Sequence, residues 1–366
     1  MALTTVVRGR AYDWTHAVGR ASASGTGFNY PQTMCLGTDG DVYVANRGNE
    51  TNFGMHVNRV RLGGPGDEEL LAEFFQYGSG DGRSTWPFGV AVDRQDHVYV
   101  TDEWTNTVSV FDGTGRFLRK WGKTGSGDGE LYRPAGLICD RDGNVIVVDA
   151  GNNRLQVFSP DGKFLRKIGK AGSGEGEFNQ PWGITLDQQG NLYVADWKNH
   201  RIQKLSPEGR FLMQIGSHGI VPVPPNAFAV TYLGPFLSSS DAPGYLKPGV
   251  LNHPTDVAVD PDGDIYVADW GNHRVSIFDA EGAPLANLHG DAQVMSKWGR
   301  QSIDANPDMM KALRRVRNLE PQWRFCFPSA VEFNPQTDEL IVADSQRNRL
   351  QIYRKVRDYV DFQANL

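Results

Sequence analysis

Short apolar runs separated by glycine-containing turns recur along the chain and form one pattern that appears six times. Each copy has a proline, a small residue, an apolar segment that ends in Asp, a Gly turn and a second apolar run. A polar loop of the type Asp-x-x-Asn-x-Arg and a further apolar strand follow. The copies begin at Pro31, Pro87, Pro134, Pro181, Pro254 and Pro328. Several short strands in each repeat of about 40–50 residues are typical of a propeller or a repeat array.

The pattern predicts an all-β protein, a six-bladed β-propeller with four-stranded antiparallel blades. In the copy that begins at Pro134, the predicted strands cover 135–139, 145–148, 155–158 and 163–168. The last copy has no fourth strand after Tyr353, whereas segment 12–19 resembles segment 163–169. We therefore expect an N-terminal strand to close the last blade, since closure removes an exposed sheet edge. The tail 354–366 lies outside the repeat, so the pattern does not predict its position.

The whole chain, 1–366, is expected to form a single propeller domain, because the blades of a propeller share one ring. Three stretches exceed the repeat, at 47–86, 216–253 and 290–327. Loops longer than about 12–15 residues in a compact domain are usually functional or disordered. These stretches are rich in aromatic residues, so we expect them to lie over the mouth of the central channel as a partial lid. Segment 308–316 is predicted to be a short helix that follows Pro307.

The repeated Pro-x-Gly segment and the Asp-x-x-Asn-x-Arg loop resemble the NHL repeat, of which six copies form a β-propeller. The clearest matches are Pro134-Ala135-Gly136 with Asp149 to Arg154, Pro181-Trp182-Gly183 with Asp196 to Arg201, and Pro254-Thr255-Asp256 with Asp269 to Arg274. The resemblance implies a propeller over nearly the whole chain. It leaves the function open, because such propellers include lyases, RNA-binding proteins and protein-interaction platforms.

The recurring Asp and Arg residues of the polar loop are expected to be structural, because a catalytic group should occur once and a fold determinant should recur. Each Asp can pair with the Arg five positions later, as Asp149 can with Arg154. His200 and His273 lie inside the same motif. We assign them to the same structural role.

Two carboxylates on the predicted inner strands depart from the repeat. Asp256 alone is charged at the small position after Pro, and Glu332 alone is charged two positions further on, in the next copy. Residues two apart on a strand face the same side, so the two carboxylates are expected to approach each other, with His253 beside them. Such a group suits either general acid–base chemistry or a divalent metal ion, Ca²⁺, Mg²⁺ or Zn²⁺. The alternative is a solvated or hydrogen-bonded channel carboxylate with a structural role.

Aromatic residues beside the inner strands and polar loops are predicted to line a ligand pocket, although packing between blades would also explain them. A cationic residue of the third long stretch could pair with a ligand carboxylate or phosphate. The predicted ligand-binding residues are Phe88, Trp182, Trp197, Tyr245, Trp270 and Arg324.

Composition limits the classes of partner and the cellular compartment that we expect for this protein. With 37 Lys and Arg against 43 Asp and Glu, the net charge of −6 argues against nucleic acid or an anionic membrane as a partner. No apolar run approaches the roughly 20 residues of a membrane helix, and no nucleotide or organic cofactor motif is present. The three widely spaced cysteines and the absence of a signal peptide pattern predict a cytoplasmic protein with free thiols.

These features predict a propeller that binds a small molecule and acts as a metal-assisted hydrolase or lyase in a lidded pocket at the channel mouth. The general plan resembles amidating lyases and lactonase-type propellers. Amidating lyases place zinc-binding His directly after the inner-strand Pro, and the chain lacks that zinc site, because these positions hold Gln32, Phe88, Ala135, Trp182, Thr255 and Ser329. The alternative function is a non-catalytic platform that binds a protein partner.

Overall fold

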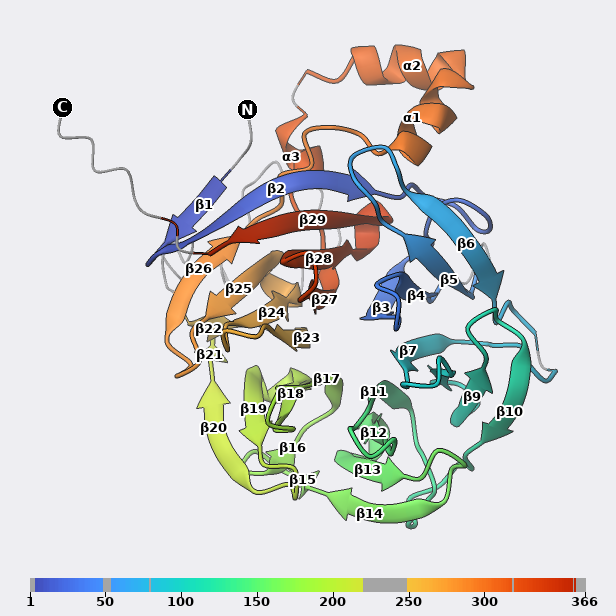
Figure 1. Cartoon of the computed structure of the whole chain (residues 1–366), viewed down its shortest axis with the longest axis vertical. Coiled ribbons are helices and arrows are strands. Elements are labelled where there is room, and N and C mark those ends of the chain that lie inside the picture. Colours follow the sequence, from blue (N-terminus) through green and yellow to red (C-terminus); the bar gives the residue numbers. More distant parts are fainter. Residues whose placement is uncertain are drawn as a thin grey trace.

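The computed structural model describes residues 4–48, 54–78, 80–219, 249–317, 319–357 and 359. It shows six antiparallel sheets arranged as blades around a central axis (Figure 1). The predicted six-bladed, all-β propeller with four-stranded blades is therefore confirmed. In each blade the first strand lies nearest the axis, and the following strands lead outward to the rim.

The first five blades follow the chain in order. Blade 1 contains β3 (Pro31–Leu36), β4 (Val42–Asn46), β5 (His56–Arg61) and β6 (Glu69–Phe74). Blade 2 contains β7 (Pro87–Val92), β8 (Val98–Asp102), β9 (Thr107–Phe111) and β10 (Phe117–Trp121). Blade 3 contains β11 (Pro134–Cys139), β12 (Val145–Asp149), β13 (Arg154–Phe158) and β14 (Phe164–Ile168). Blade 4 contains β17 (Pro181–Leu186), β18 (Leu192–Asp196), β19 (Arg201–Leu205) and β20 (Phe211–Ile215). Blade 5 contains β23 (Pro254–Val259), β24 (Ile265–Asp269), β25 (Arg274–Phe278) and β26 (Pro284–Leu288).

Blade 6 joins the two ends of the chain. It contains β27 (Pro328–Asn334), β28 (Glu339–Asp344), β29 (Arg349–Val356), β2 (Arg10–Val18) and the added edge strand β1 (Thr4–Val7). Strand β2 pairs antiparallel with β29 from Ala11 to Val18, which confirms the predicted closure by an N-terminal strand. Strand β29 continues to Val356, so the first residues of the tail belong to the blade.

Two short parallel ribbons connect blades at the rim of the mouth. They are β15 (Lys170–Ala171) with β16 (Glu177–Phe178), and β21 (Ser217–His218) with β22 (Val250–Leu251). Most of the long stretch 216–253, including Tyr245, lies outside the described residues. The stretch 47–86 contains strands β5 and β6, so much of it forms part of blade 1.

The third long stretch forms three helices, α1 (Lys297–Asp304), α2 (Pro307–Arg314) and α3 (Glu320–Trp323). Helix α2 is the helix predicted at 308–316. The Oγ atom of Ser296 caps α1 and donates to the carbonyl of Gly19, and Trp298 packs in one cluster with Val18 and Val60. Helices α1 and α2 therefore lie at the outer rim beside β2 and β6 (Figure 1) and do not extend over the channel mouth.

The core consists of apolar layers between neighbouring blades. All residues of the second strands β4, β8, β12, β18 and β24 are buried, as expected for continuous apolar runs covered on both faces. The inner strands approach each other closely in blades 2 to 4. A Cβ atom at Gly89 would lie 2.5 Å from the carbonyl of Ala135, and one at Gly136 would lie 2.6 Å from the carbonyl of Trp182. The small position after Pro is therefore a packing requirement.

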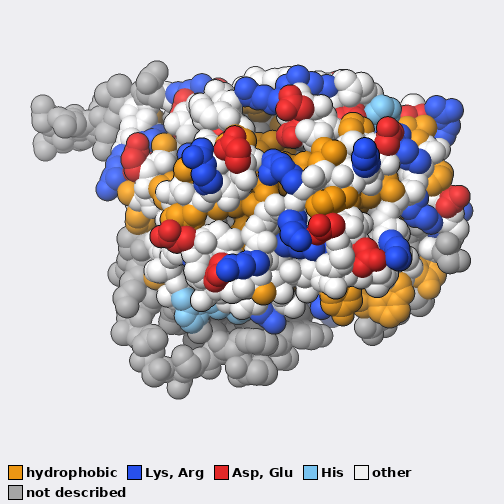
Figure 2. Space-filling model, turned by 90° about the horizontal axis from the view of Figure 1, so that it is seen from below, with side chains coloured by type: hydrophobic (Ala, Val, Ile, Leu, Met, Phe, Trp, Pro, Cys, Tyr) orange, Lys and Arg blue, Asp and Glu red, His pale blue; other side chains and the backbone are white. Residues whose placement is uncertain are grey.

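The rim of the ring carries both signs of charge. Lys and Arg side chains alternate with Asp and Glu on the side seen in Figure 2, and ion pairs such as Lys167–Asp128 at 2.8 Å join them. Among the described residues, no helix is long and apolar enough to cross a membrane. The thiols of Cys35, Cys139 and Cys326 are free.

Candidate functional site

An ion pair of the repeated polar loop links neighbouring strands in blades 3 to 6. The carboxylate of the strand-ending Asp accepts from Nε of the Arg five residues later, at 2.8 Å for Asp149–Arg154 and 2.9 Å for Asp196–Arg201. The Asp269–Arg274 and Asp344–Arg349 pairs, at 2.8 Å, repeat this contact. All four Asp side chains are buried. The recurrence of the same bond in four blades shows that these residues support the fold, as expected.

A second repeated contact joins each blade to the next one, and we call it the seam latch. The backbone N–H of the residue before the inner-strand Pro donates to the side chain four positions after the strand-ending Asp in the polar loop of the previous blade. This side chain precedes Arg in four latches and Thr107 in the latch of blade 2. The five latches are Tyr30–Asn348, Arg133–Asn106, Gln180–Asn153, His253–His200 and Phe327–His273, with distances of 2.7, 2.6, 2.7, 3.1 and 3.2 Å. Both residues of every latch have a left-handed backbone with φ between 49° and 58°.

His200 and His273 replace Asn as latch acceptors, which explains their place in the motif. Each accepts through Nδ1, so Nδ1 must be unprotonated. Burial lowers the pKa of His200 to about 4, with added repulsion from His253 and His218. Burial also lowers the pKa of His273 to about 4, with a contribution from Arg347. Both rings are therefore neutral near pH 7 and keep the latches intact.

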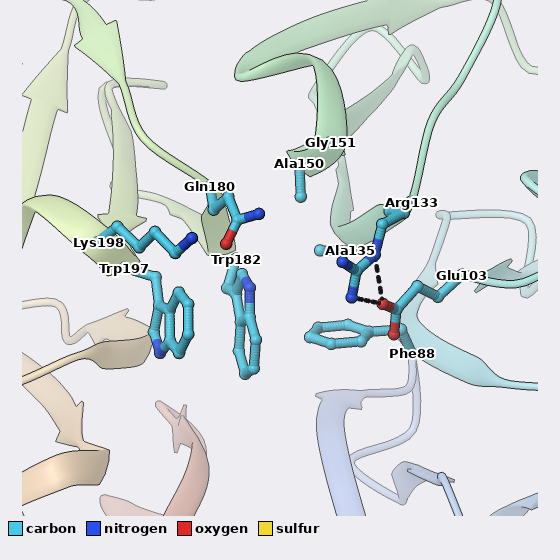
Figure 3. Close-up of a pocket in the computed structure, with 10 residues that line it drawn as sticks. All are labelled: Phe88, Glu103, Arg133, Ala135, Ala150, Gly151, Gln180, Trp182, Trp197 and Lys198. Carbon is cyan, nitrogen blue, oxygen red and sulfur yellow. Dashed lines mark hydrogen bonds and ion pairs between the residues drawn. The ribbon is translucent and has the colours of Figure 1, made fainter. Parts of the chain in front are cut away.

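A cavity of about 270 Å³ opens at the channel mouth over blades 2, 3 and 4, and we call it the mouth pocket. Its walls come from the starts of the inner strands β7, β11 and β17 and from the polar loops around them (Figure 3). It is lined by Phe88, Glu103, Arg133, Ala135, Ala150, Gly151, Gln180, Trp182, Trp197 and Lys198. Arg133 and Gln180 are latch donors, so the seam fixes the backbone from which both side chains enter the pocket.

Three aromatic rings form one side of the mouth pocket. The indoles of Trp182 and Trp197 stack with a centroid distance of 4.8 Å and an angle of 5° between their planes. The ring of Phe88 stands at 86° to Trp182 at 5.2 Å, so the two rings form a corner (Figure 3). On its far side, Trp197 contacts the His253 ring at 4.7 Å. The stack thus connects the pocket to the seam between blades 4 and 5.

Charged groups form the opposite side of the mouth pocket. Nε of Arg133 donates to Oε1 of Glu103 at 2.8 Å, and Nη2 of Arg133 contacts the same oxygen. The second oxygen of Glu103 forms an ion pair of 2.9 Å with Arg47. One buried carboxylate thus faces two guanidinium groups. Lys198 extends over Trp197 with Nζ 5.9 Å from the ring centroid and points toward Gln180 (Figure 3).

The inner-strand carboxylates Asp256 and Glu332 lie near each other but outside the mouth pocket. Burial raises the pKa of Asp256 well above its usual value, and the charge of Glu332 raises it further. Oδ2 of Asp256 accepts from the backbone N–H of Val331 at 3.2 Å, which bridges blades 5 and 6. Burial raises the pKa of Glu332 to about 7. The protein environment therefore favours the protonated, neutral form of both carboxyls.

His253, predicted to join Asp256 and Glu332, contacts other residues instead. The His253 ring bonds to Asn252 through Nδ1 at 2.8 Å and packs against Trp197 and His200. Within the described ranges, no three or more His, Cys, Asp or Glu side chains are grouped so that they could hold a metal ion. A divalent ion at Asp256, Glu332 and His253 stays a prediction.

Of the predicted ligand-binding residues, Phe88, Trp182 and Trp197 line the mouth pocket. Trp270 packs on Phe327 at 4.5 Å in blade 5, and Arg324 bonds to the carbonyl of Gly290. Tyr245 lies outside the described residues. Sequence reasoning missed the four polar lining residues, Glu103, Arg133, Gln180 and Lys198. A signal existed for Arg133, because it is the only Lys or Arg that directly precedes an inner-strand Pro in the six copies.

A wider hollow of about 890 Å³ lies at the other end of the same three inner strands. The carboxylates of Asp93, Asp140 and Asp187 line it, but each accepts hydrogen bonds from two backbone N–H groups of its own turn. Turn formation accounts for these carboxylates. The mouth pocket is therefore the better candidate for a ligand site.

Comparisons with known proteins agree with the fold. A family described as a 6-bladed beta-propeller (DUF5128) matches residues 91–149 and 131–216, and the NHL repeat matches residues 251–278. No curated protein matches the chain. Together with the six blades, these matches define the protein as a six-bladed β-propeller. One of its repeats, at residues 251–278, matches the NHL repeat.

Solved structures with the same fold are distant in sequence. A protein of unknown function from Bacteroides thetaiotaomicron is 15% identical with a TM-score of 0.58, and the match covers 95% of this chain and 76% of that one. A catalytically inactive virginiamycin B lyase from Staphylococcus aureus with quinupristin is 12% identical with a TM-score of 0.53, covering 94% and 99%. Hydrazine synthase from Kuenenia stuttgartiensis is 16% identical with a TM-score of 0.53, covering 93% and 99%. At such identities the similarity shows the fold.

Proposed function

We propose that the protein binds a small molecule in the mouth pocket. The observation that carries this proposal is the combination of an open cavity of about 270 Å³, a corner of aromatic rings and polar side chains that converge on it. Ligand sites are typically concave and mostly apolar, with a few polar groups that fix orientation. The volume lies near the lower end of the usual range of roughly 300–1,000 Å³, so the ligand is small.

The pocket is not a by-product of the repeat. Residues that serve the fold recur from blade to blade, as the Asp–Arg pairs and seam latches do. The stacked Trp182 and Trp197 and the Arg133–Glu103 pair each occur once in the described ring. Trp182 and Trp197 are only partly buried although they stack. Large aromatic surface left accessible beside a cavity supports a ligand-binding role.

The direct test is a screen of small molecules by thermal shift, followed by titration calorimetry on Trp182→Leu. We expect compounds that stabilise the wild-type protein to lose at least tenfold in affinity for the variant, because the ring wall is removed. Trp104→Leu is the control, since Trp104 is 62% exposed and lies outside the pocket. Equal loss in both variants, or binding that Trp182→Leu leaves unchanged, would move the site elsewhere.

A hydrolase or lyase reaction is the second candidate function. The observation that favours it is the raised pKa of Glu332, about 7, which suits a general acid or base near neutral pH. Burial also raises the pKa of Asp256 beside it, which makes this carboxyl a second candidate group. The fold shared with virginiamycin B lyase allows such a role but does not assign it. If these carboxyls act on a substrate at their own position, turnover of a substrate found by screening should disappear in Glu332→Gln and Asp256→Asn while binding in the mouth pocket persists. Metal analysis of the purified protein tests the divalent ion.

A further inference from the structure

We infer that the mouth pocket selects a small planar aromatic carboxylate, with its ring in the corner of Trp182 and Phe88 and its carboxylate at Arg133. This inference rests on the proposed function and names the ligand class for the same site. Three features carry it: the geometry of the aromatic corner, the unused hydrogen-bonding capacity of Arg133, and the excess of positive charge around the cavity.

The aromatic corner favours a flat ring. Trp197 covers one face of Trp182 in a parallel stack. The opposite face of Trp182 looks into the cavity, above Phe88 and across from Arg133 (Figure 3). A planar ring in this space continues the stack on Trp182 while Phe88 supports it from a perpendicular direction. Offset-stacked and edge-to-face arrangements are the two favoured geometries of aromatic pairs, so one planar ligand would satisfy both.

Arg133 is oriented to receive an anion. Its Nε and Nη2 atoms bond to one oxygen of Glu103, which fixes the plane of the guanidinium group. The remaining nitrogen, Nη1, is directed toward the cavity and Trp182 in Figure 3. A held guanidinium with a free N–H pair is preorganised for a carboxylate. The Arg133 side chain is 50% exposed, so a ligand can reach it.

The charges around the cavity favour an anion over a cation or a neutral molecule. The Glu103 carboxylate is shared between Arg133 and Arg47, which leaves one positive charge in excess. Lys198 adds a second at the rim. A cationic ligand would be repelled by these groups, and a neutral ring would leave them unused. Gln180 supplies an amide that can bond to either oxygen of the ligand.

The experiment is titration calorimetry of the wild-type protein with a matched series of probes. Naphthoate and benzoate are compared with their neutral amides, with cyclohexanecarboxylate, with glucuronate and with naphthylmethylammonium. We expect the aromatic carboxylates to bind at least tenfold more tightly than the amides, as the loss of a hydrogen bond to a charged group predicts. Cyclohexanecarboxylate tests planarity, and glucuronate tests a sugar acid as the alternative anion.

Variants localise the effect. Arg133→Gln should reduce the affinity for naphthoate about tenfold or more and leave naphthamide nearly unchanged. Arg210→Gln is the matched control, because the Arg210 side chain is 81% exposed on an outer turn. Circular dichroism and the melting temperature check that each variant is folded.

The outcomes separate this inference from the proposed function. Equal affinity for carboxylates and amides, or tighter binding of glucuronate, would overturn the ligand class while the pocket remains a binding site. Unchanged naphthoate affinity in Arg133→Gln would overturn the assigned position of the carboxylate. If screening also finds no ligand whose affinity depends on Trp182, the proposed function itself fails.

Discussion

The side-chain oxygen of Asn106 accepts a hydrogen bond of 2.6 Å from the backbone N–H of Arg133. This seam latch joins blade 2 to blade 3 and holds Arg133 in a left-handed conformation with φ of 50°. Such a backbone is uncommon for a residue with a side chain, and the latch stabilises it. The same contact therefore closes the ring and sets the direction from which Arg133 enters the mouth pocket.

Asn106→Ala should weaken ligand binding indirectly, through Arg133, because Asn106 itself does not line the mouth pocket. Loss of the latch leaves the Arg133 N–H without its acceptor and should cost about 1–3 kcal/mol in the free energy of unfolding. Asn348→Ala removes the equivalent latch to Tyr30, away from the pocket. We expect similar melting temperatures for the two variants but weaker naphthoate binding only for Asn106→Ala. Equal affinities in calorimetry would show that the latch does not position Arg133.

The histidine latch at His273 makes the seam between blades 5 and 6 sensitive to acid. Its pKa is about 4 in the folded protein and 6.5 in the unfolded chain, so between these values the unfolded state binds the extra proton. Stability therefore falls as the pH drops from about 6.5 to 4, and no further loss arises from this group below 4. By linkage, the loss between pH 7 and pH 5 is about 2 kcal/mol.

His273→Asn should keep the latch and remove this pH dependence, because Asn is the acceptor at three other seams. The free energy of unfolding in urea, measured at pH 7 and pH 5, gives the slope for wild-type protein and variant. A shallower slope in the variant supports the latch. His97→Asn is the control, since His97 lies in a turn and bonds to Asp93. An unchanged slope in His273→Asn would contradict the assignment.

The repeat made the fold predictable, whereas the pocket depends on exceptions to the repeat. Six copies of the strand pattern, four of which have an Asp and an Arg five residues apart, determine the blades. The missing strand after Tyr353 indicates closure by the N-terminus. Trp182 and Phe88 could be found because they replace small or polar residues after Pro. Glu103 could not, because its role depends on Arg133 and Arg47, which approach it only when blades 1 to 3 are assembled.

The sequence pattern also did not predict the position of the tail, which begins at residue 354. Lys355 extends β29 beyond the repeat and is 3% exposed. Its Nζ atom lies 2.5 Å from Asp260, 2.9 Å from Asp262 and 2.8 Å from Asp264, all in the turn of blade 5. No local pattern predicts a contact between residues more than 90 positions apart in the chain.

Lys355→Met should destabilise the ring by about 3–5 kcal/mol, because it leaves the buried carboxylates of Asp260 and Asp264 without this cation. Arg357→Met is the control. Arg357 forms an ion pair of 3.3 Å with Asp262 in the same cluster, but its side chain is 39% exposed, so its loss should cost at most about 1 kcal/mol. Chemical denaturation of both variants provides the comparison. Similar, small losses would mean that the cluster does not secure the closure.

Glu332→Gln should stabilise the protein at high pH. Burial raises the pKa of Glu332 from 4.5 to about 7, so the folded state holds a proton that the unfolded state releases between these values. The wild-type protein therefore loses stability as the pH rises from 4.5 through 7, and the loss is constant above that range. Gln cannot ionise, so the variant avoids a penalty of at most about 3 kcal/mol at pH 8 and gains nothing at pH 4.5.

Unfolding in urea at pH 4.5, 6 and 8 measures this difference directly. Glu69→Gln is the control, because the Glu69 side chain is 60% exposed at the rim and should show no pH-dependent gain. If Glu332→Gln is more stable at pH 8 but also loses a reaction found by screening, the carboxyl is retained for chemistry at a cost in stability. A difference between wild type and variant that does not change with pH would show that folding leaves the pKa of Glu332 unshifted from 4.5. It would remove Glu332 as a proton donor near neutral pH.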